Sequence, residues 1–358
     1  MTDRKNASFT EIVRMHSEKY PLMQAQDYVK LAYQHTLGPG HMVKDFTTAL
    51  NRIQEERNSG ENGVSFEMIG NGLTRMHLSG NDAFLSGETI ARMFMYTASS
   101  FHPAENGLKE ALDAISALIA CAGLPVSQAD FTRYLSTYKQ SGMPLVSHTE
   151  VYRNAYAPKY RVIKDSFQTF SKIYEALEEI KRRKPGAIVA IDGMCASGKS
   201  TLAEEIAFVM DAPLFHMDDY FLPMEKRTEK RLQEIGGNVD RERFYEEILL
   251  PLSEGKSVRF RPFDCSQMAL LPPVAKEAGQ INIVEGAYAC HPDLIEKYDF
   301  IICMNIDPAL QRERILKRDG ERMLRRFENE WIPMELNYLN HFKIAENANL
   351  TYMIQDNA

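Results

Sequence analysis

The spacing of apolar residues changes near residue 185 of this 358-residue chain. Before that point apolar side chains recur three and four positions apart, which is the period of an amphipathic helix. This period predicts helices over residues 8–18, 23–36, 43–58, 87–100, 106–122, 127–140 and 160–183. After it, short continuous apolar runs alternate with helical stretches, a pattern typical of a parallel sheet covered by helices. The sequence therefore predicts an α/β domain preceded by a mainly helical one.

One β-hairpin is expected to interrupt the helical part. Residues 65–70 and 73–78 are strand-like runs, and Asn71 and Gly72 stand between them. Asn-Gly is favoured in two-residue hairpin turns because both residues accept the positive φ angles that such turns require. The first domain is therefore predicted to be mainly helical with a single hairpin.

The domain boundary is predicted at the end of the last helical stretch. Residues 181–184 are all basic, and Pro185 and Gly186 follow them. Basic side chains complement the dipole at a helix C-terminus, and Pro and Gly stop a helix there. We therefore interpret the basic run as a solvated helix end rather than a nucleic-acid patch. The predicted domains are 1–184, with no assigned role, and 185–358.

The strongest motif is the run Gly193-Met194-Cys195-Ala196-Ser197-Gly198-Lys199-Ser200, which fits the pattern G-x-x-x-x-G-K-[ST]. The apolar run 187–191 before it predicts a buried strand, and 201–210 after it predicts a helix. In this context backbone N–H groups surround phosphates, the lysine reaches the β and γ oxygens, and the hydroxyl binds Mg²⁺. The motif predicts a P-loop NTPase domain that binds ATP or GTP together with Mg²⁺, and we take ATP as the expected nucleotide. The predicted nucleotide-binding residues are Gly193, Ala196, Ser197, Gly198, Lys199, Ser200 and Thr201.

Acidic residues end two further apolar runs. Asp218 and Asp219 follow the start of the run 213–221, and Glu285 ends the run 281–285. Strand ends in open α/β sheets face the ligand crevice, so these carboxylates are expected near the phosphates. A carboxylate there can orient an attacking hydroxyl, and another can hold Mg²⁺ together with Ser200.

An arginine-rich helix follows the fourth expected strand, 299–307. Arginine side chains over a nucleotide can stabilise the charge of a transferring phosphoryl group. We expect one or two of the arginines to act in this way and the others to form a solvated face. They are Arg312, Arg314, Arg318, Arg322, Arg325 and Arg326.

Together these segments resemble the uridine kinase and phosphoribulokinase-type group of P-loop kinases, over about residues 186–355. The resemblance implies that Asp218 is the catalytic base, with Asp219 in the neighbouring hydroxyl position. It implies that Asp240, in the segment Asn-Val-Asp, binds the ribose hydroxyls of a nucleoside. It also implies that Glu285 lies near the metal ion.

The resemblance extends to the arginine helix and to the base-binding segment, with departures in both. Arg314 and Arg318 match the family's helix arginines, while Gln311 stands where an earlier arginine is expected. Phe263 takes the place of a tyrosine in the base-binding segment, and Gln267 takes the place of a histidine. Gln267 can still hydrogen-bond an amide-like base edge, but discrimination depends on matched donors and acceptors, so the exchange leaves a changed acceptor open.

The reaction class predicted from these residues is transfer of the ATP γ-phosphoryl group to a hydroxyl of a small molecule, with a nucleoside as the first candidate. A non-nucleoside acceptor is the alternative, either pantothenate-like or a sugar phosphate, for which Arg259 and Arg261 offer positive charge. A nucleotide-dependent switch that binds a partner is a further alternative. The pair Asp218 and Asp240 argues against a switch, which needs no acceptor site.

Charge and composition limit the kinds of molecule that this protein is expected to bind. The formal net charge is −7, whereas proteins that bind nucleic acids or membrane surfaces normally carry a basic excess. Five scattered cysteines without C-x-x-C spacing suit a reducing compartment. No apolar run approaches the length needed to span a bilayer. We therefore expect a cytoplasmic protein with a small-molecule substrate, and the sequence leaves both a monomer and a homo-oligomer open.

The first domain has two chemically dense segments, a glycine turn before His41 and the stretch from His148 to Arg161. In one interpretation they line a second pocket for an anion or a substrate. In the other, which we favour, His41 caps a turn and the tyrosines and arginines form a helix packing face with snorkelling ends. The domain weakly resembles an N-terminal extension on some bacterial uridine kinase-like proteins, and the resemblance implies no defined activity for it.

Overall fold

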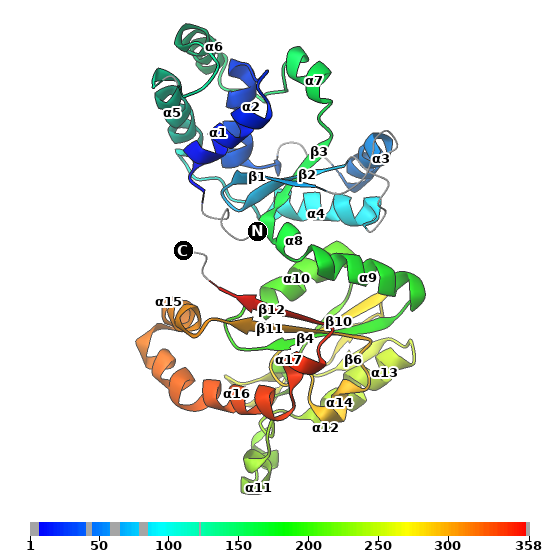
Figure 1. The fold of residues 1–358 in the computed structure, drawn as a ribbon. Helices are drawn as coiled ribbons and strands as arrows, with labels where there is room; N and C mark the ends of the chain where they lie inside the picture. Colours follow the sequence, from blue (N-terminus) through cyan, green and yellow to red (C-terminus); the bar gives the residue numbers. More distant parts are fainter. Residues whose placement is uncertain (1–6, 41–44, 58–64, 79–84, 122, 356–358) are drawn as a thin grey trace. The chain divides into compact units, whose positions relative to one another are not determined.

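The computed structural model describes residues 7–40, 45–57, 65–78, 85–121 and 123–355. The chain divides into two compact units, with the division between Lys172 and Ile173 (Figure 1). The sequence placed this boundary after residue 184. The difference arises because nearly all of the last predicted helix, α9 (Ser171–Arg183), makes its contacts in the second unit.

Helices in the first unit follow the predicted positions closely as far as residue 140. They are α1 (Phe9–Lys19), α2 (Ala25–Leu37), α3 (Phe46–Arg57), α4 (Gly87–Ser100), α5 (Gly107–Ala120) and α6 (Gln128–Gln140), with the short α7 (Glu150–Tyr156) and α8 (Asp165–Thr169) after them. Several begin at residues that cap them, such as Ser8, whose hydroxyl accepts from Glu11 N while the Glu11 carboxylate accepts from Ser8 N. Such reciprocal caps satisfy two of the N–H groups that a helix start leaves free.

The long helix predicted over residues 160–183 is wrong in its first part. Tyr160–Lys164 forms a strand, β3, which pairs antiparallel with β2 (Leu73–His77), and β2 pairs with β1 (Phe66–Gly70). The unit therefore contains a three-stranded sheet rather than a lone hairpin. The reason is tertiary, because four of the five residues of β2 are buried and β3 satisfies the backbone groups along its second edge.

The turn between β1 and β2 has the conformation that its sequence predicts. Gly70 pairs with Leu73 across a two-residue loop in which Asn71 has φ 55° and Gly72 has φ 69°. Positive φ at both central residues matches the twist of the two strands.

The sheet of the first unit has helices on both faces. Helices α1 and α2 contact β1, and α5 and α6 pack outside them (Figure 1). Helix α4 contacts β3, and α3 packs against α4. Fully buried apolar side chains, among them Tyr28, Leu31 and Ile115, fill the space between α2, α5 and the sheet.

The second unit has a parallel sheet, as predicted, with four strands in the expected segments and a fifth near the C-terminus that the sequence did not indicate. Its strand order is β12-β11-β4-β10-β5. The strands are β4 (Ala187–Gly193), β5 (Leu214–His216), β10 (Ile281–Glu285), β11 (Phe300–Ile306) and β12 (Leu350–Ile354). Helix α10 (Lys199–Met210) covers one face, and α13 (Leu250–Ser253) and α17 (Ile344–Asn347) contact the other. Because β4 lies between strands that continue in opposite directions along the sheet, the crevice at its carboxyl end is the expected ligand site.

The remaining elements of the second unit lie outside this sheet. They are α11 (Glu229–Gln233), α12 (Arg241–Phe244), α14 (Pro292–Ile295), α15 (Pro308–Arg326), α16 (Ile332–His341) and the short strand pairs β6 (Val258–Phe260) with β9 (Val274–Lys276) and β7 (Phe263–Asp264) with β8 (Ala269–Leu270). Among the described residues, no helix has the length and apolar composition that crossing a bilayer requires.

The hairpin turn gives a test of the first unit's fold. A Cβ on Gly72 would meet no atom within 4 Å, so Gly72→Ala introduces no clash. It should lower the unfolding free energy by about 1 kcal/mol, because alanine adopts the left-handed backbone conformation less readily than glycine. Gly107→Ala is the matched control, since Gly107 begins α5 and its Cβ would make ordinary contacts at 3.6 Å. Urea denaturation of the full chain, followed by circular dichroism, should show a lower unfolding free energy for Gly72→Ala and not for Gly107→Ala. Equal stability of the two variants would contradict the turn conformation.

Candidate functional site

The predicted phosphate loop joins the end of β4 to the start of α10 in a conformation that requires glycine. Gly193 has φ 130°, and a Cβ there would lie 2.1 Å from the Met304 carbonyl oxygen of β11. Gly198 has φ 97° at the N-cap of α10. The loop therefore leads directly into a helix N-terminus, where free N–H groups and the helix dipole favour an anion.

Two side chains of the loop itself point to a phosphate site. Lys199 Nζ donates to the carbonyl oxygens of Gly193 and Met194, both at 2.9 Å, so the side chain folds back over the loop. Ser197 Oγ is buried and has no hydrogen-bond partner in the described part of the chain. A ligand oxygen at the loop would provide what the Ser197 hydroxyl lacks.

A buried carboxylate, Asp192, holds the start of the loop. Its oxygens accept from Gly193 N at 2.6 Å, Cys290 N at 2.8 Å and Tyr338 Oη at 2.7 Å. The side chain is fully buried, and this burial raises the pKa of Asp192 above its usual value. The three donors offset part of the cost of burying a charged group.

Two side chains from distant helices hold the middle of the loop at Cys195. Glu335 Oε2 of α16 accepts from Cys195 N at 2.8 Å, and Gln311 Nε2 of α15 donates to Cys195 O at 2.9 Å. Gln311, noted in the sequence as the place of a missing arginine, thus binds the loop backbone. Glu335 was missed, because no local motif marks a residue 140 positions away along the chain. Burial raises the pKa of the Cys195 thiol to about 12, so the thiol stays protonated.

A small apolar cluster lies against the same part of the loop. Ile315, Leu324 and Phe327 form its buried centre, and Ala196 and Trp331 pack against it. The Trp331 ring meets the Phe327 ring edge to face at 4.5 Å. The loop backbone is thereby held by apolar packing as well as by hydrogen bonds.

The predicted metal residues lie together at the carboxyl edge of the sheet. Ser200 Oγ donates to Glu285 Oε2 at 3.2 Å, and His216 Nδ1 lies 2.6 Å from Glu285 Oε1. The Glu285 carboxylate raises the pKa of His216. Hydroxyl and carboxylate oxygens are ligands that Mg²⁺ accepts, with phosphate oxygens and water completing its coordination. Ser200 and Glu285 therefore fit such an ion, and His216 is a neighbour that the sequence did not reveal.

Asp218 and Asp219 occupy the turn of 3₁₀-helix (Met217–Tyr220) directly after β5. Asp218 is an exposed residue, but the protein groups around it limit its hydration; this desolvation and the negative charge of Glu285 raise its pKa, while Lys199 opposes the effect. Burial also raises the pKa of Asp219. The charges of Glu285 and Lys199 therefore act on Asp218, as expected for a carboxylate beside a phosphate loop.

The two predicted arginines differ in their positions. Arg314 Nη1 donates to the Ala196 carbonyl oxygen at 3.1 Å, so Arg314 lies at the loop. Arg318 is largely exposed, its Nε donates to Asp319 Oδ2 at 2.8 Å, and its guanidinium lies 5.8 Å from the Phe327 ring centre. The structure thus brings one of the pair to the loop.

The residues predicted to bind the acceptor have partners within the protein. Asp240 is fully buried at the N-cap of α12, and its two oxygens accept from Lys226 Nζ at 3.0 and 2.8 Å. Phe263 is buried in β7. Gln267 is exposed, and its amide donates to Asp264 Oδ2 at 2.7 Å. Contact of Asp240, Phe263 and Gln267 with an acceptor stays a prediction.

A basic residue that the sequence did not single out connects the Asp218 turn to α12. Arg243 Nη2 donates to the Asp219 carbonyl oxygen at 3.2 Å, and its guanidinium lies 4.0 Å from the centre of the Tyr220 ring. Asp240 N also donates to the Tyr220 carbonyl oxygen, at 2.6 Å. Hydrogen bonds from Arg243 and Asp240 therefore hold the carbonyl groups of Asp219 and Tyr220, in the turn that contains Asp218.

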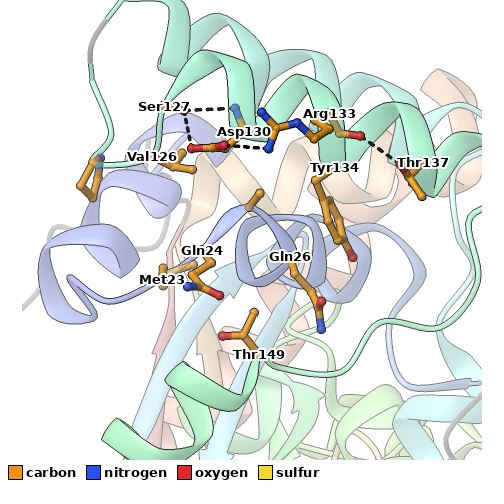
Figure 2. Close-up of a pocket in the computed structure, with 12 residues that line it drawn as sticks. Met23, Gln24, Gln26, Val126, Ser127, Asp130, Arg133, Tyr134, Thr137 and Thr149 are labelled. Atoms are coloured by element: carbon orange, nitrogen blue, oxygen red, sulfur yellow. Dashed lines mark hydrogen bonds and ion pairs between the residues drawn. The ribbon is translucent and has the colours of Figure 1, made fainter.

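The first unit has a cavity between the N-termini of α2 and α6, of about 570 Å³ (Figure 2). Ser127 caps α6 there by accepting from Asp130 N at 3.1 Å, and Arg133 donates to Asp130 at 3.3 Å. These contacts are those of an ordinary helix start. His41, named in the sequence interpretation of this unit, lies outside the described residues.

No protein-family model matches the chain, and no curated protein matches it. Solved structures with a similar arrangement include a possible uridine kinase from Bacillus stearothermophilus, which is 17% identical with a TM-score of 0.37 and covers 51% of this chain and 99% of its own. A shikimate kinase from Bacteroides thetaiotaomicron is 15% identical with a TM-score of 0.24, and covers 47% of this chain and 85% of its own. At such low similarity the activities of those proteins do not carry over to this chain.

The contact between Glu335 and the loop gives a test of the site. Glu335→Ala leaves Cys195 N without its acceptor, so the affinity of the full chain for inorganic triphosphate should fall about tenfold. Glu335→Gln keeps an oxygen acceptor and should change the affinity less. Glu330→Ala is the matched control, because Glu330 is exposed and pairs with Arg326. Isothermal titration calorimetry would measure the affinities, and equal values for Glu335→Ala and Glu330→Ala would show that Glu335 does not hold the loop.

Proposed function

We propose that this chain is a kinase that transfers the γ-phosphoryl group of ATP to a hydroxyl of a small molecule. The observation that carries the proposal is the meeting of Ser200 and Glu285 at 3.2 Å beside the phosphate loop, with Asp218 at the end of the adjacent strand β5. Phosphate binding, metal binding and an acceptor carboxylate are the parts that phosphoryl transfer requires.

In this proposal the loop holds the triphosphate. Its N–H groups and the N-terminus of α10 donate to phosphate oxygens, and Lys199 exchanges the carbonyl oxygens of Gly193 and Met194 for β and γ oxygens. Ser200 and Glu285 hold Mg²⁺, which when bound neutralises charge on the β and γ phosphates. Arg314, already at the loop, stabilises charge on the transferring group.

Asp218 orients the acceptor hydroxyl and takes its proton. A raised pKa suits this role, since a base works best when its pKa lies closer to the working pH than that of an ordinary carboxylate. Asp219 is held through its carbonyl by Arg243, which fixes the turn that presents Asp218.

A nucleoside is the first candidate acceptor, on the strength of the motif resemblance. One observation favours an anionic acceptor instead, namely that Asp240 is already neutralised by Lys226, whose side chain is half exposed. An acceptor with a carboxylate or phosphate would find a cation there rather than a free carboxylate. Arg261, offered by the sequence for a sugar phosphate, instead donates to the carbonyl oxygens of Leu270 and Leu271.

Replacement of Asp218 tests the reaction. Asp218→Asn should lower acceptor-dependent ATP consumption at least a hundredfold, because the base is lost, while ATP affinity stays within a few-fold. Lys199→Ala should instead weaken ATP binding or turnover about tenfold or more. The assay follows ATP consumption with Mg²⁺ against a panel of nucleosides, pantothenate-like compounds and sugar phosphates.

The same assay separates the acceptors and the switch alternative. Removal of Mg²⁺ with a chelator should abolish turnover. Full turnover by Asp218→Asn would exclude Asp218 as the base, and slow ATP hydrolysis that no acceptor stimulates would favour a nucleotide-dependent switch.

A further inference from the structure

A second cavity of the first unit is lined by basic side chains. Its volume of about 570 Å³ lies in the range of sites that hold small organic molecules. Among its described lining residues are four cations, Lys30, Arg52, Arg153 and Arg161, and one carboxylate, Glu56. The cavity therefore has an excess of positive charge in a chain that is acidic as a whole.

Arg161 is the most informative of these cations. It lies on β3 with 7% of its surface exposed, and its Nη1 donates to Glu56 Oε2 at 2.7 Å and to Tyr160 O at 3.0 Å. Its Nη2 is buried and has no hydrogen-bond partner in the described part of the chain. A buried charged donor without a partner is destabilising, so a ligand oxygen at Nη2 would stabilise this side chain.

Lys30, on α2, is a second buried cation in the same cavity. It is 9% exposed, and its Nζ donates to the Val146 carbonyl oxygen at 2.9 Å. An ammonium group has three hydrogens to donate, so this one contact does not saturate it. Burial, with the charge of Arg75 nearby, lowers the pKa of Lys30 to about 8. An anion beside Lys30 would accept from the remaining N–H groups and would raise the pKa of Lys30 back toward its usual value.

The polar wall behind these cations is already satisfied and offers them no further acceptor. His148 Nδ1 lies 2.9 Å from Asp27 Oδ1, and burial lowers the pKa of His148 to about 4, so the ring is neutral and Nδ1 donates. His148 Nε2 then accepts from Tyr160 Oη at 2.6 Å. Gln34 Oε1 accepts from Arg75 Nε at 3.0 Å and Nη2 at 2.7 Å. The missing acceptor for Arg161 and Lys30 must therefore come from outside this network.

We propose that this cavity binds a small organic phosphate. The phosphate oxygens accept from Arg161 Nη2 and Lys30 Nζ, and the organic part lies against the apolar lining residues Phe94 and Leu145. A phosphate monoester offers two charges and three acceptor oxygens, which match several converging cations better than a carboxylate does. The site lies wholly on residues of the first unit and does not depend on the proposed kinase activity.

The test uses the full chain with Lys199→Ala, so that the phosphate loop does not dominate binding. Phenyl phosphate, titrated by calorimetry at low salt, should bind with a Kd of about 1 mM or tighter. Adding Arg161→Gln should weaken binding at least tenfold. Arg133→Gln is the matched control, since it removes the same charge from the cavity between α2 and α6 (Figure 2) and should leave the affinity unchanged.

Circular dichroism would establish that Arg161→Gln is folded. Arg153→Gln serves as the second variant, because Arg153 lines the cavity but is exposed, and it should weaken binding several-fold. The proposal is overturned if phenyl phosphate does not bind up to roughly 10 mM, or if the folded Arg161→Gln and Arg153→Gln proteins bind as Arg133→Gln does. Benzoate binding as tightly as phenyl phosphate would overturn the choice of phosphate.

Discussion

The second unit depends on the buried carboxylate of Asp192. It stands at the end of the central strand and accepts from its own loop, from Cys290 beyond β10 and from Tyr338 of α16. Cys290 and Tyr338 lie 98 and 146 residues from Asp192 along the chain, so one carboxyl group connects the sheet, the loop and the C-terminal helices. The two carboxyl oxygens provide the acceptor sites for all three bonds, and a buried charge without such donors would be too costly. The conformation of the phosphate loop is thus a property of the whole unit.

The parts of the structure that could be predicted are those whose signal is contiguous in sequence. The strands β4, β10 and β11 are short and mostly apolar runs, and the loop between β4 and α10 is one eight-residue motif. The hairpin turn at Asn71 and Gly72 is likewise local, because two positive φ angles demand those residue types. Each of these elements lies where the sequence placed it.

The parts that could not be predicted depend on contacts between distant segments. Residues 160–164 form a strand because β2 offers them an edge, and no local pattern outweighs that pairing. Glu335 and His216 reach the site from α16 and β5, and neither belongs to a recognisable motif. The exchange of an arginine for Gln311 was visible, but its contact with Cys195 O became clear only from the folded arrangement. The predicted roles of Asp240, Phe263 and Gln267 depend on an acceptor and stay predictions.

The strand β3 also changes the interpretation of the first unit. The sequence interpretation placed the tyrosines and arginines of residues 148–161 on one helix packing face, but the helix covers only Glu150–Tyr156 and a strand begins at Tyr160. Tyr160 and Arg161 are consecutive residues of this strand, and both line the basic cavity. Tyr160 donates to His148 within the hydrogen-bonded network, whereas Arg161 Nη2 has no hydrogen-bond partner in the described part of the chain.

The apolar cluster beside the phosphate loop has an optical consequence. Trp331 is the single tryptophan of the chain, and it packs in the same cluster as Ala196 of the loop. Its emission depends on the polarity and packing around the indole ring, so a change in the loop is transmitted to the one strong intrinsic fluorophore of the protein. The chain thereby contains its own label-free reporter, and stopped-flow fluorescence can follow the loop in real time in the unmodified protein.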